Sequence, residues 1–205
     1  MPVVVLISGR GSNLQAILEA RIPVQAVVSN VAGAGGLAVA AQRGIATRVV
    51  PHRDFPTREA FEAVLMREID AFSPRLVVHA GFMRIVTAGY VEHYRWRSLN
   101  IHPSLLPSFT GLHTHERALA AGVKLHGCTV HFVTEELDGG PIVLQAAVPV
   151  LANDTAESLS NRVLRQEHLI YPRAIRWFLE DRLVIANGKV SVKGNDAQYL
   201  LSDRV

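Results

Sequence analysis

The stretch LNIHPSLLP, residues 99–107, carries three polar side chains at every second position of an otherwise apolar run. Alternate residues of an extended chain point to the same side, so Asn100, His102 and Ser104 share one face. Pro103 keeps His102 extended, and Ser104 is expected to begin the following loop. An Asn amide can donate to a carbonyl oxygen, and a His exchanges a proton near neutral pH. Asn100 and His102 therefore suit a site where a carbonyl becomes an oxyanion, although a solvent-facing edge strand would show the same pattern.

A glycine-rich turn, ISGRGSNL, follows the first apolar run of the chain. Gly9 and Gly11 allow a tight turn, and Ser12 or Asn13 is expected to cap the helix that follows. Backbone N–H groups at a helix start bind anions. A dinucleotide fingerprint would need glycine where Leu14 stands, and a Walker A loop would need a Lys-Ser or Lys-Thr pair. The turn therefore predicts a site for a single phosphate group, with a plain tight turn as the alternative.

A second turn, LDGGP at residues 137–141, contains Asp138. Asp138 has no helix to cap, because Pro141 is expected to start a strand. A structural turn aspartate is the simpler interpretation. If the sheet brings Asp138 close to His102, however, its carboxylate would favour the imidazolium form of the histidine.

The remaining polar clusters predict less chemistry. His113 and His115, in LHTH, have no carboxylate or cysteine at ligand spacing, so we expect no metal site and interpret this stretch as polar surface loop. Glu167 and His168 fall within a helical pattern and, on that pattern alone, are expected on its solvent-facing side.

The elements expected to position these residues alternate between strand and helix along the first half of the chain. Apolar runs of strand length indicate burial on both faces, as in a parallel sheet. The helical patterns between them imply right-handed crossovers and an open, Rossmann-like α/β sheet with helices on both faces. The expected strands are 3–7, 24–29, 47–50 and 76–80, and the expected helices are 13–20, 36–43 and 57–72.

The pattern changes after residue 82. A strand at 99–102 and a short helix at 114–121 precede two strands, 128–133 and 142–150, whose short connection predicts an antiparallel portion of the sheet. A long helix at 155–181, interrupted by Pro172, and a hairpin turn at Asn187-Gly188 follow. We expect one domain with an N-terminal phosphate-binding half (1–98), a catalytic half (99–186) and a C-terminal tail (187–205).

Composition limits the possible partners. The chain has 205 residues and a formal net charge of only +3, with no run of four basic residues, so nucleic acid is not an expected partner. Its single cysteine, Cys128, excludes an intramolecular disulfide and fits a reducing cytoplasm. The N-terminal apolar run is too short to span a membrane and has no basic region before it. Small molecules are the expected partners.

Several motifs together resemble those of the phosphoribosylglycinamide formyltransferase family, which is folate-dependent. They are VVLISGRGSNLQAI, GFMRI, SLNIHPSLLP, GLHTH, GCTVHFVTEELDGGPIVLQ and RQEHLIYP, and the likeness runs from about Val3 to Trp177. The resemblance implies transfer of a formyl group from 10-formyltetrahydrofolate to the amine of glycinamide ribonucleotide in de novo purine biosynthesis. It implies a cytoplasmic monomer or homodimer that needs no metal.

The resemblance also implies roles for particular residues. The catalytic residues would be Asn100, His102 and Asp138. Ribonucleotide contacts fall on the phosphate loop and on the last helix, at Gly11, Ser12, Asn13 and Glu167. Folate contacts fall on Arg58, Met83, Arg84, Ile85 and Val86, on Asn100, and on the loop of Thr134, Glu135, Glu136, Leu137 and Asp138.

Two positions depart from the family pattern. Leu164 stands where a glutamine commonly contacts the ribonucleotide, and Thr110 stands where proline is common before Gly111, which could loosen a lid formed by 104–125. Formyltetrahydrofolate hydrolase would use the same three catalytic residues with water as acceptor, but normally has an extra N-terminal domain. Methionyl-tRNA formyltransferase would need a further RNA-binding domain. A catalytically inactive nucleotide-binding module would have no reason to keep all three catalytic residues.

Overall fold

The computed structural model describes residues 2–202, which form two compact units. The first unit runs to Asn100 and includes Val133–Glu135; the second comprises Ile101–Phe132 and the chain from Glu136 onward. No helix of the described residues is long and apolar enough to cross a membrane. The last three residues of the expected tail lie outside the described range.

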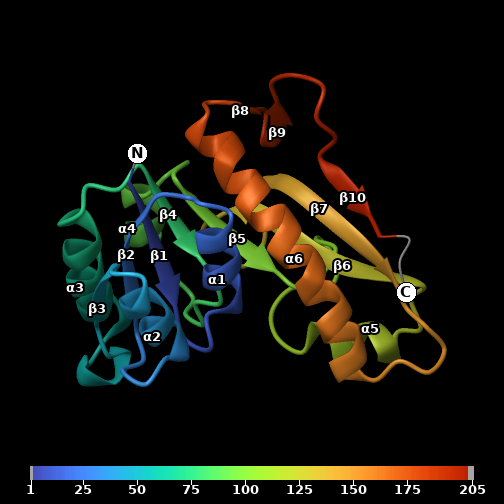
Figure 1. Cartoon of the computed structure of the whole chain (residues 1–205), viewed down its shortest axis with the longest axis horizontal. Coiled ribbons are helices and arrows are strands. Elements are labelled where there is room, and N and C mark those ends of the chain that lie inside the picture. Colours follow the sequence, from blue (N-terminus) through green and yellow to red (C-terminus); the bar gives the residue numbers. More distant parts are fainter. Residues whose placement is uncertain (1, 203–205) are drawn as a thin grey trace. The chain divides into compact units, whose positions relative to one another are not determined.

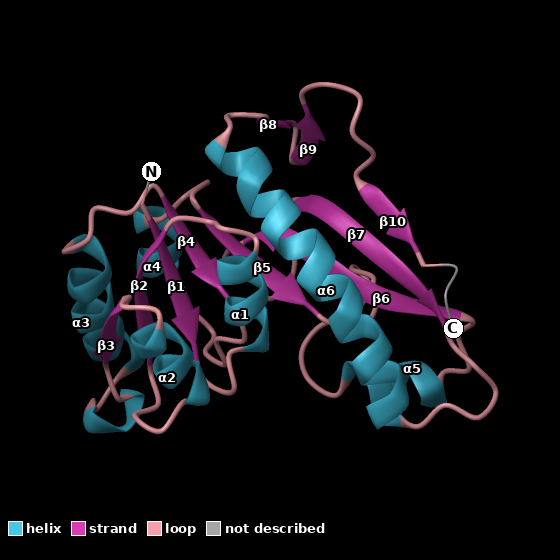
Figure 2. Ribbon diagram, viewed as in Figure 1, coloured by secondary structure: helices cyan, strands magenta, loops and turns pink. Residues whose placement is uncertain are grey.

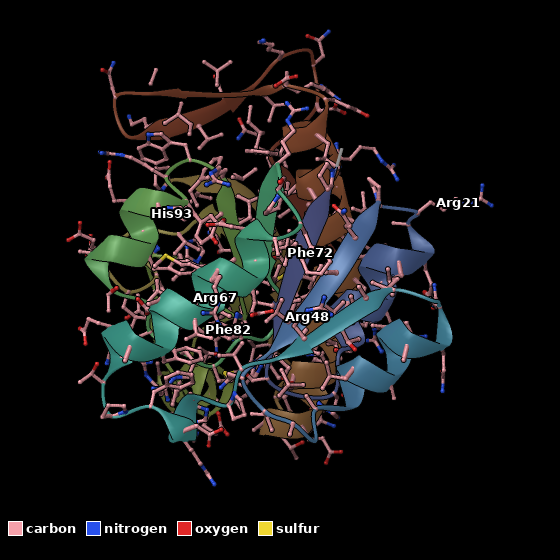
Figure 3. All side chains as sticks on the ribbon, turned by 90° about the vertical axis from the view of Figure 1, so that its left-hand side faces the viewer. Arg21, Arg48, Arg67, Phe72, Phe82 and His93 are labelled. Atoms are coloured by element: carbon pink, nitrogen blue, oxygen red, sulfur yellow. The ribbon has the colours of Figure 1, made fainter. Side chains whose placement is uncertain are left out.

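The first unit is a parallel sheet with helices on both faces (Figures 1 and 2). Its strands lie in the order β5-β4-β1-β2-β3. Helices α1 and α2 cover one face, and α3 and α4 cover the other (Figure 3). The strands are β1 (Val3–Ile7), β2 (Val24–Ser29), β3 (Ala46–Val49), β4 (Leu76–His79) and β5 (Ser98–His102), and the helices are α1 (Ser12–Glu19), α2 (Gly35–Gln42), α3 (Arg58–Asp70) and α4 (Ala88–His93). A 3-10 turn, η1, spans His52–Asp54.

This arrangement confirms the predicted strands and helices of the first half and adds α4 and η1, which the sequence did not predict. Continuous apolar strands are buried on both faces, as the five buried residues of β1 show. One face packs aromatic and aliphatic side chains of α3 and α4 against β1, β2 and β4, including Phe61, Leu65, Ile69, Tyr90 and Tyr94. The strand order reverses between β1 and β4, which is where open α/β sheets bind ligands, beyond the carboxyl ends of the strands.

The second unit contains a mixed sheet. Strand β6 (Leu125–Phe132) pairs antiparallel with β7 (Ile142–Pro149), and β10 (Tyr199–Leu201) pairs parallel with β7. Helices α5 (Thr114–Ala120) and α6 (Ala156–Leu179) accompany this sheet, and β8 (Leu183–Ala186) and β9 (Lys189–Val192) form the hairpin predicted at Asn187-Gly188. The predicted fold class, a mostly parallel open sheet with an antiparallel C-terminal portion, is confirmed.

Two details of the second unit differ from the sequence-based expectation. Pro172 does not interrupt α6, which continues through it with the proline buried inside the helix. Proline inside a helix removes one backbone hydrogen bond, a cost that burial of the apolar helix face can offset. The tail expected at 187–205 contains β9 and β10, so it is not merely a polar extension.

Candidate active site

Strand β5 carries the first two predicted catalytic residues. Asn100 and His102 lie two positions apart in this strand, so their side chains point to the same side. Asn100 is half-buried, His102 is 6% exposed, and Ser104 is fully buried at the start of the following loop. A solvent-facing edge strand is therefore the wrong interpretation of this pattern.

His102 and Asp138 lie side by side within the second unit, although they are far apart in the sequence. The distance from His102 Nδ1 to Asp138 Oδ2 is 3.4 Å, and both side chains are 7% exposed. The sequence left the distance between these two residues open, and the structure brings them together. A carboxylate oxygen therefore faces an imidazole nitrogen, and both side chains are shielded from solvent.

The contact made by the second ring nitrogen of His102 fixes the tautomer of the neutral ring. Nε2 lies 2.9 Å from the carbonyl oxygen of Phe109. A carbonyl only accepts hydrogen bonds, so Nε2 carries a hydrogen and donates it. A neutral His102 then has its lone pair on Nδ1, facing Asp138, and a proton added to Nδ1 makes the imidazolium. The contact with Phe109 therefore holds the ring with Nδ1 toward the Asp138 carboxylate.

Two further groups lie against the Asp138 carboxylate, and one of them, a backbone N–H, donates to it. The backbone N–H of Gly111 donates to Asp138 Oδ2 at 2.8 Å, and His131 Nε2 lies 3.8 Å from Oδ1. His131 is itself held by a 2.9 Å contact between Nδ1 and the carbonyl oxygen of Phe132, and burial lowers its pKa. Asp138 has a left-handed backbone with φ of 55°, a conformation that Asp tolerates better than most residues. These contacts fix the direction in which the carboxylate points.

The loop that follows β5 is held by buried hydroxyl groups. Thr129 Oγ1 donates to the carbonyl oxygen of Ser104 and accepts from Leu106 N–H, and Thr114 Oγ1 donates to the carbonyl oxygen of Pro103. The peptide bond before Pro107 is cis. The loop carbonyl that contacts His102 is therefore supported from β6 and α5.

The LHTH stretch is more buried than expected. Thr114 is 3% exposed, and the His115 ring meets the His126 ring edge to face, with 5.2 Å between centroids. Burial lowers the pKa of His126 to about 4 and also lowers the pKa of His115. The expectation of a polar surface loop is therefore wrong for this part of the segment. Among the described residues, no group of three or more His, Cys, Asp or Glu side chains is placed to hold a metal ion.

The glycine-rich turn lies in the first unit, directly after β1. Gly11, with φ of 82°, is the N-cap of α1, and no side chain caps this helix. The expectation that Ser12 or Asn13 would cap it is wrong, because both already belong to the helix or its first turn. A Cβ on Gly11 would lie 2.6 Å from the Cα of Gly36, so only glycine fits. N–H groups at the start of a helix favour an anion, so the start of α1 suits one.

Ser8 connects this turn to a second predicted binding segment. Its N–H donates to the carbonyl oxygen of Gly81, and its Oγ accepts from the N–H of Met83 at 2.8 Å. The residues implied in folate binding, 83–86, therefore lie beside the turn at the switch point of the first unit. Met83 and Ile85 are 66% and 51% exposed. Arg58, the other implied folate contact of this unit, is exposed at the first turn of α3.

The other implied contacts lie in the β6–β7 connection and on α6. Thr134 and Glu135 belong to the first unit, and Glu136 and Leu137 to the second. Glu167, on α6, is 7% exposed, so its expected place on the solvent-facing side of the helix is wrong. Burial raises the pKa of the Cys128 thiol, and the negative charge of the Glu167 carboxylate raises it further. Leu164 is half-buried one turn earlier.

Sequence reasoning missed three contributors to the site. These are His131, the backbone N–H of Gly111 and the backbone carbonyl of Phe109. His131 could have been found, because it precedes the Asp138 turn at the end of a strand. The two backbone groups carry no signal in residue type.

Comparison with known proteins agrees with this geometry. The family described as formyl transferase matches residues 1–175. The chain is 54% identical over 189 residues to the phosphoribosylglycinamide formyltransferase of Escherichia coli (strain K12), with 89% of each chain covered. It matches the structure of the phosphoribosylglycinamide formyltransferase from Coxiella burnetii with a TM-score of 0.92, 48% identity and 98% of both chains covered. A formyltetrahydrofolate deformylase from Pseudomonas syringae matches at 30% identity and a TM-score of 0.86, over 93% of this chain and 65% of that one. The chain belongs to the formyl transferase family.

Proposed function

We propose that this protein transfers the formyl group of 10-formyltetrahydrofolate to the amine of glycinamide ribonucleotide. The names of its relatives support phosphoribosylglycinamide as the acceptor of a formyl group. The observation that carries the proposal is the buried contact between His102 Nδ1 and Asp138 Oδ2 at 3.4 Å. Asn100 lies two positions before His102 on the same strand, β5. Family membership alone gives the type of group transferred. The site supplies the means of transferring it.

The chemistry follows from the three side chains. Formyl transfer to an amine passes through a tetrahedral centre whose oxygen gains negative charge, and a proton must move from the attacking nitrogen to the leaving one. Asn100 donates from its amide to that oxygen, and the positive charge of the His102 imidazolium stabilises the negative charge that develops there. Asp138 lies against the imidazolium, accepts the proton of the attacking amine directly or through a water molecule, and returns it to the leaving nitrogen, so that tetrahydrofolate departs as a neutral amine. The backbone carbonyl of Phe109 holds the ring in the orientation that this scheme needs.

The turn at Gly11 to Asn13 binds the ribonucleotide phosphate in this proposal. Two observations support this assignment. No side chain caps the start of α1, and the backbone of Gly11 lies so close to that of Gly36 that a side chain would not fit. The positive end of the helix dipole favours a dianion there. Binding energy gained at the phosphate, remote from the chemistry, orients the amine. Glu167 is proposed to contact the glycinamide end.

The reduced folate supplies the formyl group, and residues 83–86 fit its flat heterocycle. Within the part of the chain that the structure describes, no backbone hydrogen bond engages Arg84, Ile85 or Val86, so their N–H and C=O groups are left for a ligand. Exposed side chains of Met83 and Ile85 add apolar surface. Arg58 and the loop of residues 134–138 are the further proposed folate contacts. Three properties of the protein remain predictions: its location in the cytoplasm, the absence of nucleic acid partners and a monomeric or dimeric state.

Turnover of 10-formyltetrahydrofolate with and without glycinamide ribonucleotide tests the proposal. Release of tetrahydrofolate only when the ribonucleotide is present supports formyl transfer. Equal release in its absence supports the hydrolase, for which the uncapped phosphate turn would have no purpose.

A further inference from the structure

Residues 83–87 form the connection that leads from β4 into α4. Met83 and Ile85 are exposed, whereas Thr87 is the N-cap of α4. The segment is neither helix nor strand, and exposed segments of this kind would be mobile unless side chains from elsewhere held them.

Both ends of the segment are tied to other elements of the first unit. At its start, Met83 N–H donates to Ser8 Oγ, which in turn donates to Asn30 Oδ1 at 2.6 Å. At its end, Thr87 N–H donates to both carboxylate oxygens of Glu62, at 2.9 and 3.2 Å. Thr87 Oγ1 donates to Glu62 Oε2 in a short hydrogen bond. Glu62 therefore takes both donors that Thr87 offers.

Glu62 comes from α3, which lies beside α4; Arg67 marks α3 and His93 marks α4 in Figure 3. It is 2% exposed, an unusual place for a carboxylate unless strong donors satisfy it. Because Thr87 Oγ1 gives its hydrogen to Glu62, its lone pair is directed to the N–H of Tyr90 at 3.4 Å. Glu62 thus completes the N-cap of α4 and fixes where the preceding residues end.

The pKa of the Glu62 carboxyl is set by its burial, by Thr87 and by charged groups on its own helix. Burial raises its pKa, the hydrogen bonds from Thr87 lower it, and Arg58 and Glu59 on the same helix act in opposite directions. From α4, the Tyr90 hydroxyl is the titratable group nearby, and burial raises its own pKa so that it stays neutral. A loss of the Glu62 charge on acidification is therefore felt mainly by Thr87.

We propose that Glu62 is a positioning residue for folate binding: it anchors Thr87 and thereby holds the free backbone groups of residues 84–86 in place for the heterocycle. This inference rests on the proposed assignment of residues 83–86 to folate. Fixing a loop before the ligand arrives removes an ordering cost from binding, so the effect belongs to folate affinity and not to the chemical step.

Steady-state kinetics with both substrates varied separately tests the inference. We expect Glu62→Ala and Thr87→Val to raise the KM for 10-formyltetrahydrofolate about tenfold, with kcat and the KM for glycinamide ribonucleotide nearly unchanged. Thr87→Ser keeps both donors and should restore wild-type values. We also expect the folate KM of the wild type to rise at acidic pH, because a protonated Glu62 holds the two Thr87 donors less strongly. Glu62→Gln keeps the size of the side chain but not its charge, so its folate KM should not show this rise.

Tyr94→Phe is the matched control. The Tyr94 hydroxyl joins the other end of α4 to α3, through Asp70 Oδ1 at 2.9 Å and the carbonyl oxygen of Met66 at 3.3 Å, both on α3. Its removal should lower stability without changing the folate KM. A parallel loss of kcat and both affinities in Glu62→Ala and Tyr94→Phe would mean general destabilisation and would overturn the inference.

Ile85→Ala separates this inference from the function on which it rests. If Ile85→Ala raises the folate KM and the Glu62 and Thr87 variants do not, the positioning role of Glu62 is wrong. If none of these variants changes the folate KM, the assignment of residues 83–86 to folate is wrong and the inference fails with it.

Discussion

Replacing Asp138 by asparagine removes the charge that faces His102 and little else. The asparagine oxygen can still accept from Gly111 N–H, and asparagine tolerates the left-handed backbone of this position. At 3.4 Å, Coulomb's law gives a pair of unit charges about 5 kcal/mol at an effective dielectric of ~20 and about 1 kcal/mol in bulk water. With both side chains only 7% exposed, the larger figure is the closer one.

The imidazolium form of His102 should therefore lose several kcal/mol of stabilisation. Part of this loss is offset by the asparagine dipole and by water. Because each 1.4 kcal/mol is worth about a factor of ten in rate, we expect Asp138→Asn to lower kcat about a hundred- to a thousandfold. The KM for glycinamide ribonucleotide should change little, since its phosphate site lies elsewhere.

The assay is initial-rate formation of tetrahydrofolate at saturating concentrations of both substrates. Asp154→Asn is a matched control, because Asp154 is a buried carboxylate of the same unit that pairs with Arg162 at 2.6 Å. That variant should lose stability, as broken buried ion pairs do, while its folded fraction keeps wild-type kcat. A decrease of less than about tenfold in Asp138→Asn would refute the proposed role of the carboxylate.

Three other predictions concern the remaining parts of the site. Asn100→Ala removes one donor to the oxyanion and should lower kcat about a hundredfold or more with both KM values retained; a change in KM alone would assign Asn100 to binding. Ser12→Glu places a carboxylate at the start of α1 and should weaken ribonucleotide binding at least about tenfold in calorimetry, whereas equal loss of folate affinity would argue against a phosphate site. His126 is neutral in the folded protein because burial lowers its pKa from 6.5 to about 4, so the unfolded chain binds a proton first as pH falls. Stability in urea should therefore decrease between about pH 6.5 and 4, by up to roughly 3 kcal/mol from His126, and His126→Gln should reduce that dependence.

Most of the first unit could be predicted from the sequence because its strands are buried on both faces. Continuous apolar runs such as Val3–Ile7 leave little choice of structure. The short helix α4 was missed, since six residues with a buried tyrosine show no full helical period. Strand β6 begins at Leu125, earlier than predicted. The prediction missed its start because His126 and Gly127 interrupt the apolar pattern of the sequence, although both are buried.

The site itself could be predicted only in part. Alternation along β5 indicates which side chains share a face, and residue type indicates what they can do. The His102–Asp138 distance depends on tertiary structure, because it is set by the pairing of β6 with β7 and by the left-handed backbone at Asp138. The choice of Gly11 as helix cap depends on its close approach to Gly36, which no local pattern reveals. Backbone partners such as Phe109 leave no trace in residue type.

The fate of the formyl carbon tests the central claim most directly. The enzyme would be given 10-formyltetrahydrofolate labelled at the formyl carbon together with unlabelled glycinamide ribonucleotide, and the products separated and weighed by mass spectrometry. Formyl transfer predicts the label on the glycinamide nitrogen of the ribonucleotide in the wild type and far less of it in His102→Ala. Label recovered as free formate, at a rate independent of the ribonucleotide, would contradict the account.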